Sequence, residues 1–111
     1  MEVKSTPYKH CDLVKVEGRV DSSTAPVFSE ALTAITGDGR YRIVLDFSKL
    51  EFISSAGLRV LINTQKECRR YNRGELVLAC VPTNIHNALD LSGFVELFKL
   101  FPDVVTAVGH F

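Results

Sequence analysis

Two adjacent serines, Ser54 and Ser55, stand where a buried segment gives way to an amphipathic one, just before Ala56 and Gly57. A hydroxyl at the start of a helix lies where backbone N–H groups have no partner inside the helix. A phosphate added there is stabilised by the helix dipole and adds about −1.5 to −2 charge. The segment therefore predicts a modifiable hydroxyl at Ser55, with Ser54 as a second candidate. The alternative is that one of the serines simply caps the helix.

The sequence lacks the patterns that a catalytic serine or a nucleotide-binding loop requires. Ser55 is not part of a Gly-x-Ser-x-Gly turn, and no histidine has the context of a catalytic triad. No Gly-x-x-x-x-Gly-Lys-Ser/Thr loop is present, and Gly57 stands alone. The cysteines and histidines are scattered without the spacing of metal ligands. We therefore expect a protein that is modified and bound by other proteins and is not itself an enzyme. We also expect no metal and no cofactor.

Charged side chains provide two further candidates for a binding surface. Asp21 precedes the first predicted helix, and the carboxyl ends of parallel strands meet at one edge of a sheet, so Asp21 can share a surface with Ser55. Its alternative role is turn formation or helix capping. If the helix after Ser55 continues far enough, one side of it carries a basic stripe: Arg59, Lys66, Arg70 and Arg73. The stripe is either a docking face for an acidic partner or simply the solvent-exposed side of the helix, opposite its core face.

Hydrophobic periodicity alternates between strands and helices in the first half of the chain. Val14, Val16 and Val20 alternate with polar residues, which predicts a strand that follows an earlier one near Val3. Helical spacing follows Asp21 and stops at Gly37-Asp38-Gly39. The nearly continuous apolar run over residues 42–47 predicts a strand buried on both faces. Residues 48–53 are expected to be a connection that carries three apolar residues and is anchored by them.

The second half continues the alternation. The helix that starts near Ser55 is expected to fade over residues 71–74, with Gly74 as its C-terminal cap. Its core residues Leu58, Leu61 and Ile62 are expected to pack against the strands around Leu45 and Val77. The remaining predicted elements are strands over residues 75–81 and 97–101 and helices over residues 84–91 and 103–108.

This order of elements predicts an α/β fold. Strands that alternate with helices through short connections imply a mixed, partly parallel sheet of about four to five strands, covered by about four helices. No linker or internal repeat divides the chain.

Several motifs in the same order resemble the STAS domain of bacterial anti-sigma factor antagonists, over nearly the whole chain. A hydrophobic strand ends in Asp46, and Phe52-Ile53 leads into Ser54-Ser55-Ala56-Gly57-Leu58, which is similar to the family's Asp-Ser-Ser/Thr/Ala-Gly-Leu segment. Gly18–Asp21 matches the family's Gly-x-hydrophobic-Asp, and Leu91–Phe94 matches its Ser-Gly-hydrophobic turn. The resemblance implies a single STAS-type domain over residues 1–111.

The resemblance also implies a function. Ser55 matches the serine that these antagonists present for phosphorylation, whereas Ser54 stands where the family usually has aspartate. The unphosphorylated protein would bind an anti-sigma factor that is a GHKL-type serine kinase and so release a sigma factor. Phosphorylation of Ser55 would weaken this binding, and a PP2C-type phosphatase would restore it. The implied partner-binding residues are Asp21, Ser54, Ser55, Ala56, Gly57 and Arg59.

STAS-like domains also serve transport complexes, which provides the alternative function. There the domain is an accessory subunit or scaffold, for example of a lipid-trafficking ABC transporter, and the serine need not be modified. The observation that distinguishes the two functions is whether the neighbouring gene encodes a small GHKL-type kinase or an ABC permease and ATPase.

Composition limits the partner and the compartment. Thirteen Lys and Arg balance thirteen Asp and Glu, which argues against nucleic acid as a partner. The longest strongly apolar run, Leu76–Val81, is far shorter than the ~20 residues that a membrane-spanning helix needs. Three widely spaced cysteines fit a reducing compartment, and no apolar signal core follows Met1. We therefore expect a cytoplasmic protein without a membrane span.

Overall fold

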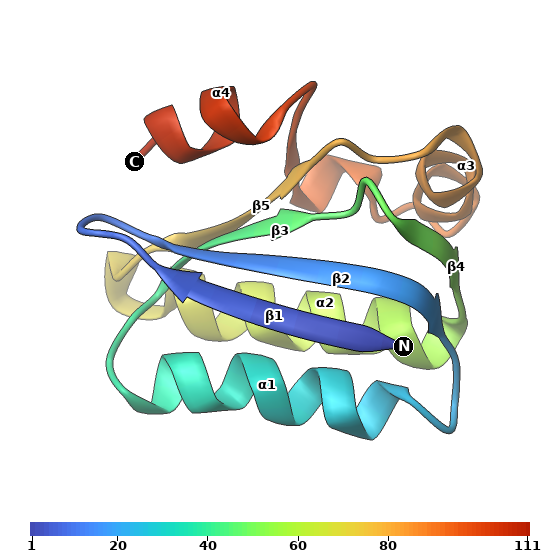
Figure 1. The fold of residues 1–111 in the computed structure, drawn as a ribbon, viewed down its shortest axis with the longest axis horizontal. Helices are drawn as coiled ribbons and strands as arrows, with labels where there is room; N and C mark the ends of the chain where they lie inside the picture. Colours follow the sequence, from blue (N-terminus) through green and yellow to red (C-terminus); the bar gives the residue numbers. More distant parts are fainter.

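A mixed β-sheet with helices on both faces forms the protein, as seen in a computed structural model that describes residues 1–111 (Figure 1). The strands are β1 (Glu2–Pro7), β2 (Asp12–Val20), β3 (Arg42–Asp46), β4 (Leu50–Ile53), β5 (Glu75–Ala79) and β6 (Lys99–Phe101). The helices are α1 (Ala25–Gly37), α2 (Ser55–Arg69), α3 (Thr83–Leu91) and α4 (Val104–Gly109), with 3-10 turns η1 (Arg70–Asn72) and η2 (Val95–Leu97).

The sheet is partly parallel, as predicted. Its main order is β1-β2-β3-β5-β6, in which only β1 runs antiparallel to its neighbour. Strand β2 has two parallel partners on the same side, because β3 pairs with its first half and β4 with its second half. The expected α/β class and four helices are confirmed, and the sheet has six strands, more than the four to five expected.

The extra strand is β4, which lies in the segment predicted as a connection. Leu50 and Ile53 are buried, whereas Glu51 and Phe52 are exposed, so the segment shows no two-residue alternation. Its ladder with β2 also shifts register after Gly18, whose φ of 89° favours glycine. A four-residue strand without alternation is recognisable only once its partner is in place, and for this reason the prediction missed it.

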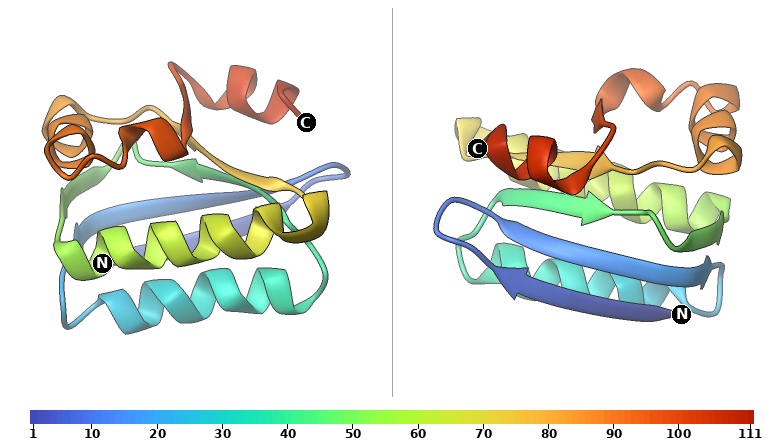
Figure 2. Two further views of the ribbon diagram at one scale, coloured as in Figure 1. Left: turned by 180° about the vertical axis from the view of Figure 1, so that it is seen from behind. Right: turned by 45° about the horizontal axis from the view of Figure 1, so that its top comes forward.

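The two faces of the sheet bury separate sets of side chains. Helices α1 and α2 lie side by side under one face, and α4 covers the other (Figures 1 and 2). Leu76 and Leu78 of β5 belong to the large core between the sheet and helices α1 and α2, together with Leu45, Leu58 and Leu61.

The residue between them, Val77, belongs to a smaller core with Ala107 of α4. As expected, Leu58 and Leu61 of α2 share the large core with Leu45 of β3. Ile62, however, is only half-buried and belongs to neither core. Helix α2 also packs on the strand around Val77, as expected, but Val77 itself faces away from α2, because successive strand residues point to opposite faces.

Helix α2 ends earlier than expected, at Arg69. Tyr71 and Asn72 take positive φ values of 58° and 56°, which closes the helix without glycine. Gly74 is therefore not the C-terminal cap. A Cβ at Gly74 would clash with the Tyr41 carbonyl oxygen, so this glycine permits a close approach of two backbones.

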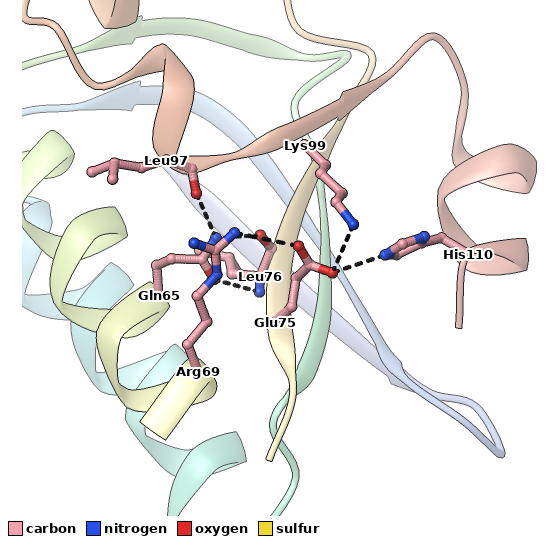
Figure 3. Close-up of polar contacts among 7 residues, drawn as sticks. All are labelled: Gln65, Arg69, Glu75, Leu76, Leu97, Lys99 and His110. Carbon is pink, nitrogen blue, oxygen red and sulfur yellow. Dashed lines mark hydrogen bonds and ion pairs between the residues drawn. The ribbon is translucent and has the colours of Figure 1, made fainter. Parts of the chain in front are cut away.

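A buried glutamine joins α2 to the sheet (Figure 3). The Gln65 amide donates hydrogen bonds to the Leu76 and Leu97 carbonyl oxygens at 3.0 and 2.8 Å. Its own oxygen accepts from the Leu76 N–H at 2.7 Å. Since a buried amide is stable only when its groups are paired, Gln65 holds α2, β5 and η2 in one arrangement.

Glu75 connects the ends of three elements near this bridge (Figure 3). Its carboxylate contacts His110 at 2.8 Å, Arg69 at 3.4 Å and Lys99 at 3.8 Å. Burial raises the pKa of Glu75, but the hydrogen bond from His110 and the charge of Lys99 outweigh it, so this pKa lies below its ordinary value. The ionised form of Glu75 therefore stabilises the folded state.

We predict that Leu61→Ala lowers the free energy of unfolding by about 2–5 kcal/mol, because a fully buried leucine leaves a cavity when truncated. Urea unfolding of the variant and the wild type measures the difference. Val105→Ala is the matched control, since Val105 is 82% exposed and should change stability by less than about 0.5 kcal/mol. Equal effects at the two positions would contradict the described core.

We also predict that Glu75→Gln removes a pH-dependent part of the stability. The lowered pKa means that this part is complete above an unfolded pKa of about 4.3 and is lost as pH falls through the folded pKa. The difference in unfolding free energy between wild type and variant should thus be largest near neutral pH and should shrink toward pH ~3. Glu30→Gln, at an exposed position of α1, is the control and should give a small, constant difference.

Candidate partner-binding site

The ends of β2 and β4 bring the starts of α1 and α2 to one edge of the sheet. Val20 and Ile53 are paired as the last residues of their strands. The Ser54 N–H then donates a 2.8 Å hydrogen bond to the Val20 carbonyl oxygen. Asp21 and Ser54 thus follow directly on two paired residues, and the structure brings together the two segments that carry the predicted site (Figure 1).

Ser54 is the residue that caps α2. Its backbone is extended, with φ −87° and ψ 175°, and its hydroxyl oxygen accepts a 3.4 Å hydrogen bond from the Gly57 N–H. Its carbonyl oxygen accepts from the Leu58 N–H at 2.9 Å. The capping role that the sequence left open between the two serines therefore belongs to Ser54.

Ser55 has a different environment, although it is only one residue further. It is the first residue of α2, its side chain is exposed, and its hydroxyl makes no hydrogen bond within the protein. The next residue, Ala56, is half-buried against the large core. Ser55 thus presents a free hydroxyl on a helix start whose position is already set by Ser54.

Gly57 allows α2 to begin directly on the two strands. A Cβ at this position would lie 2.6 Å from Ile53 Cγ1 and 2.8 Å from Val20 Cγ1, closer than side chains tolerate. Gly57 is buried, so it contributes to this surface by placing its neighbours and not by contacting a partner itself.

Asp21 uses its carboxylate inside the turn that begins α1. One oxygen accepts hydrogen bonds from the Ser23 hydroxyl at 2.7 Å, the Ser23 N–H at 3.0 Å and the Thr24 N–H at 3.2 Å. The Ser23 hydroxyl, followed by the Thr24 N–H, lowers the pKa of Asp21 below its ordinary value. The turn-forming role is therefore present in the structure, next to the start of α2.

Arg59 lies one turn after Ser55 and is exposed. The predicted stripe shortens beyond it, because α2 stops at Arg69 and Arg73 does not continue the helix. The Arg73 guanidinium instead lies 3.7 Å from the centre of the Tyr41 ring and pairs with Glu67 at 3.0 Å. Of the stripe, only Arg59 is close to Ser55; the expectation of one continuous face through Arg73 is wrong.

Two residues at this edge were missed by the sequence-based prediction. Arg19 and Phe52 are paired across β2 and β4, and the Arg19 guanidinium lies 4.3 Å from the centre of the Phe52 ring. Phe52 remains 37% exposed. The sequence showed Phe52 as part of a motif. Its contact with Arg19 depends on the ladder between β2 and β4, which the sequence did not predict.

No group of three or more His, Cys, Asp or Glu side chains is positioned to hold a metal ion. None of the helices combines the length and the apolar character needed to cross a bilayer.

Comparison with known proteins identifies the family. The model of the STAS domain family matches residues 4–107. The chain belongs to the STAS domain family. BtrV of Bordetella bronchiseptica, a relative named as an anti-sigma factor antagonist, is 37% identical over 85 residues, which cover 77% of this STAS domain protein and 72% of the relative. The resemblance inferred from the motifs is thereby confirmed, and the protein is one of the relatives of anti-sigma factor antagonists.

Solved structures share the STAS fold. An anti-sigma factor antagonist from Mycobacterium paratuberculosis superposes with a TM-score of 0.88 at 24% identity, covering 98% of this chain and 92% of that one. The phosphorylated form of SpoIIAA, a Bacillus cell fate determinant, gives a TM-score of 0.77 at 13% identity, covering 98% of both chains. At these identities the superpositions establish the fold.

We predict that Gly57→Ala destabilises the STAS domain by about 1–3 kcal/mol, because its methyl group must displace Ile53 or Val20. Gly37→Ala at the end of α1 is the matched control, since a Cβ there meets nothing within 4 Å and the substitution should be neutral or stabilising. Thermal or urea unfolding compares them. Equal stability of both variants would show that α2 does not begin as tightly on the strands as described.

Proposed function

We propose that this STAS domain protein is an anti-sigma factor antagonist that acts by partner switching at Ser55. In its unphosphorylated form it binds an anti-sigma factor that is also a GHKL-type serine kinase, and the sigma factor is released. The kinase transfers the γ-phosphoryl group of ATP to the Ser55 oxygen, with ADP and the hydroxyl proton leaving. A PP2C-type phosphatase hydrolyses the phosphoserine and restores binding.

The observation that supports this proposal is that the two serines have different roles: Ser54 caps α2, and the Ser55 hydroxyl is free. Ser54 caps α2 through Gly57, so the exposed hydroxyl of Ser55 has no structural bond to lose on modification. A phosphate on Ser55 would meet the free N–H groups and the positive end of a 15-residue helix. Phosphorylation therefore changes the surface while the fold is retained.

The change in charge is large enough for a switch. A shift from about 90% bound to about 10% bound requires a roughly 81-fold change in affinity, or about 2.6 kcal/mol. A phosphoserine adds about −1.5 to −2 charge, and burying such a charge without a partner costs more than this. One modified side chain at the centre of an interface is therefore sufficient.

The proposed partner surface surrounds Ser55. It consists of Asp21, Ser54, Ser55, Ala56, Gly57 and Arg59, with Gly57 acting by positioning. Arg59 lies about 6 Å from Ser55 along the helix axis, within reach of an acidic group on the partner. Ser54 replaces the aspartate usual in the family, so the kinase recognises this helix start without a carboxylate before the target serine.

The proposed phosphorylation cycle also implies a cellular compartment, the cytoplasm. Phosphorylation from ATP and contact with an anti-sigma factor both place the protein in the cytoplasm. Its three free cysteines, Cys11, Cys68 and Cys80, are compatible with a reducing compartment.

We predict that Ser55→Ala folds like wild type and binds the kinase constitutively, since only the modifiable hydroxyl is lost. Ser55→Asp should bind at least several-fold more weakly than Ser55→Ala, though it carries less charge than phosphoserine. Affinity for a purified GHKL-type anti-sigma factor kinase from the same organism, with and without ATP, measures both. Ser5→Ala is the matched control, since it removes an exposed hydroxyl of β1 outside the proposed partner surface and should leave both binding and phosphorylation unchanged.

Mass spectrometry of the protein recovered from cells completes the test. A phosphate mapped to Ser55 supports the proposed phosphorylation site. A phosphate mapped to Ser54 would make Ser54 the site instead. If neither serine is modified and both Ser55 variants bind like wild type, the transport-scaffold alternative replaces partner switching.

A further inference from the structure

A cationic cavity lies at the end of the sheet opposite to Ser55. Its volume is about 250 Å³, and it is formed by the hairpin between β1 and β2 and by the segment between α1 and β3. Four cationic side chains line it, Lys9, Arg40, Arg42 and Arg73, against a single carboxylate, that of Asp12. This concentration stands out in a chain whose formal net charge is zero.

Arg40 is held rigidly at the wall of the cavity. Its Nε donates to the Asp12 carboxylate at 2.6 Å, and one terminal nitrogen, Nη2, donates to the Tyr8 and Cys11 carbonyl oxygens at 2.7 and 3.3 Å. The other terminal nitrogen, Nη1, has no hydrogen-bond partner within the protein. Arg40 therefore combines a preset orientation with unused N–H donors, which lowers the entropic cost of binding a ligand.

Tyr41 is positioned in a similar way. Arg73 stacks on its ring and donates a 2.8 Å hydrogen bond to its hydroxyl oxygen. The Tyr41 hydroxyl therefore acts as an acceptor toward Arg73, and its own proton remains available to a ligand.

Two further cations at this cavity have no acidic partner. Lys9 and Arg42 are exposed and form no ion pair or side-chain hydrogen bond within the protein, whereas Arg40 and Arg73 are paired with Asp12 and Glu67. The positive charges of Lys9 and Arg42 are thus not compensated locally. An anion with several acceptor oxygens would satisfy them together with the free donors of Arg40 and Tyr41.

We propose that this cavity binds the phosphate group of a small molecule. The oriented guanidinium of Arg40 and the exposed, unpaired cations Lys9 and Arg42 match a multiply charged oxyanion. The volume accommodates a phosphate or pyrophosphate group and leaves the remainder of a larger ligand, such as a nucleoside, outside.

The site is separate from the phosphorylation switch. Helix α2 begins at Ser55 and ends near the cavity, so its 15 residues separate the two by about 21 Å along the axis. A ligand in the cavity leaves the surface around Ser55 open, and the proposal does not depend on the proposed function.

The test is a titration of the ¹⁵N-labelled protein with sodium phosphate, sodium pyrophosphate and ATP, each at the same ionic strength set with sodium chloride. We expect saturable shifts of the amide resonances of the loop at Arg40 and Tyr41. Arg42→Gln and Lys9→Gln should each raise the dissociation constant for pyrophosphate at least tenfold. Lys49→Gln is the matched control, since it removes one exposed cation at the other end of the sheet and should change the constant less than twofold.

The outcomes separate the sources of the phosphate. Equal affinities for pyrophosphate and ATP support a ligand recognised by its phosphates alone, and tighter binding of ATP supports a nucleotide whose base lies outside the cavity. Shifts that do not saturate, that sodium chloride alone reproduces, or that Lys49→Gln reduces as much as Arg42→Gln would overturn the proposal. Unchanged thermal stability of the variants excludes unfolding as the cause of a loss.

Discussion

The hydrogen bond between the Ser54 N–H and the Val20 carbonyl oxygen is the contact on which the functional end of the molecule depends. It continues the ladder between β2 and β4 by one residue and fixes where the chain leaves the sheet. The cap on Gly57 and the free hydroxyl of Ser55 both follow from that exit point. A small residue at position 57 is required for the same reason, since α2 begins against the strand ends.

This arrangement separates the groups that stabilise α2 from the proposed modification site. The groups that hold α2 in place are backbone atoms, the capping serine, the large core and the Gln65 bridge to β5 and η2. None of them is the Ser55 hydroxyl. The phosphorylation that we propose at Ser55 would therefore change the binding surface without a rearrangement of the fold.

Charge is distributed unevenly over the two ends of the sheet, although the formal net charge is zero. The amino ends of β2 and β3 gather arginines around Tyr41, and these are oriented by stacking and by carbonyl oxygens. Side chains held in this way lose little freedom when they bind an anion. The opposite end carries Ser55 and the turn of Asp21, where the proposed phosphorylation would change the charge.

The sequence by itself determined the alternation of strands and helices, the α/β class and the motif around Ser55, because periodicity and turn residues act over a few neighbouring positions. It also determined the STAS resemblance. Only the tertiary structure decided which serine caps α2, that residues 50–53 form a strand, and that Arg73 leaves the helix to stack on Tyr41. Each of these outcomes depends on a partner distant in the sequence, Val20, Gly18 or Tyr41, and local patterns carry no information about such partners.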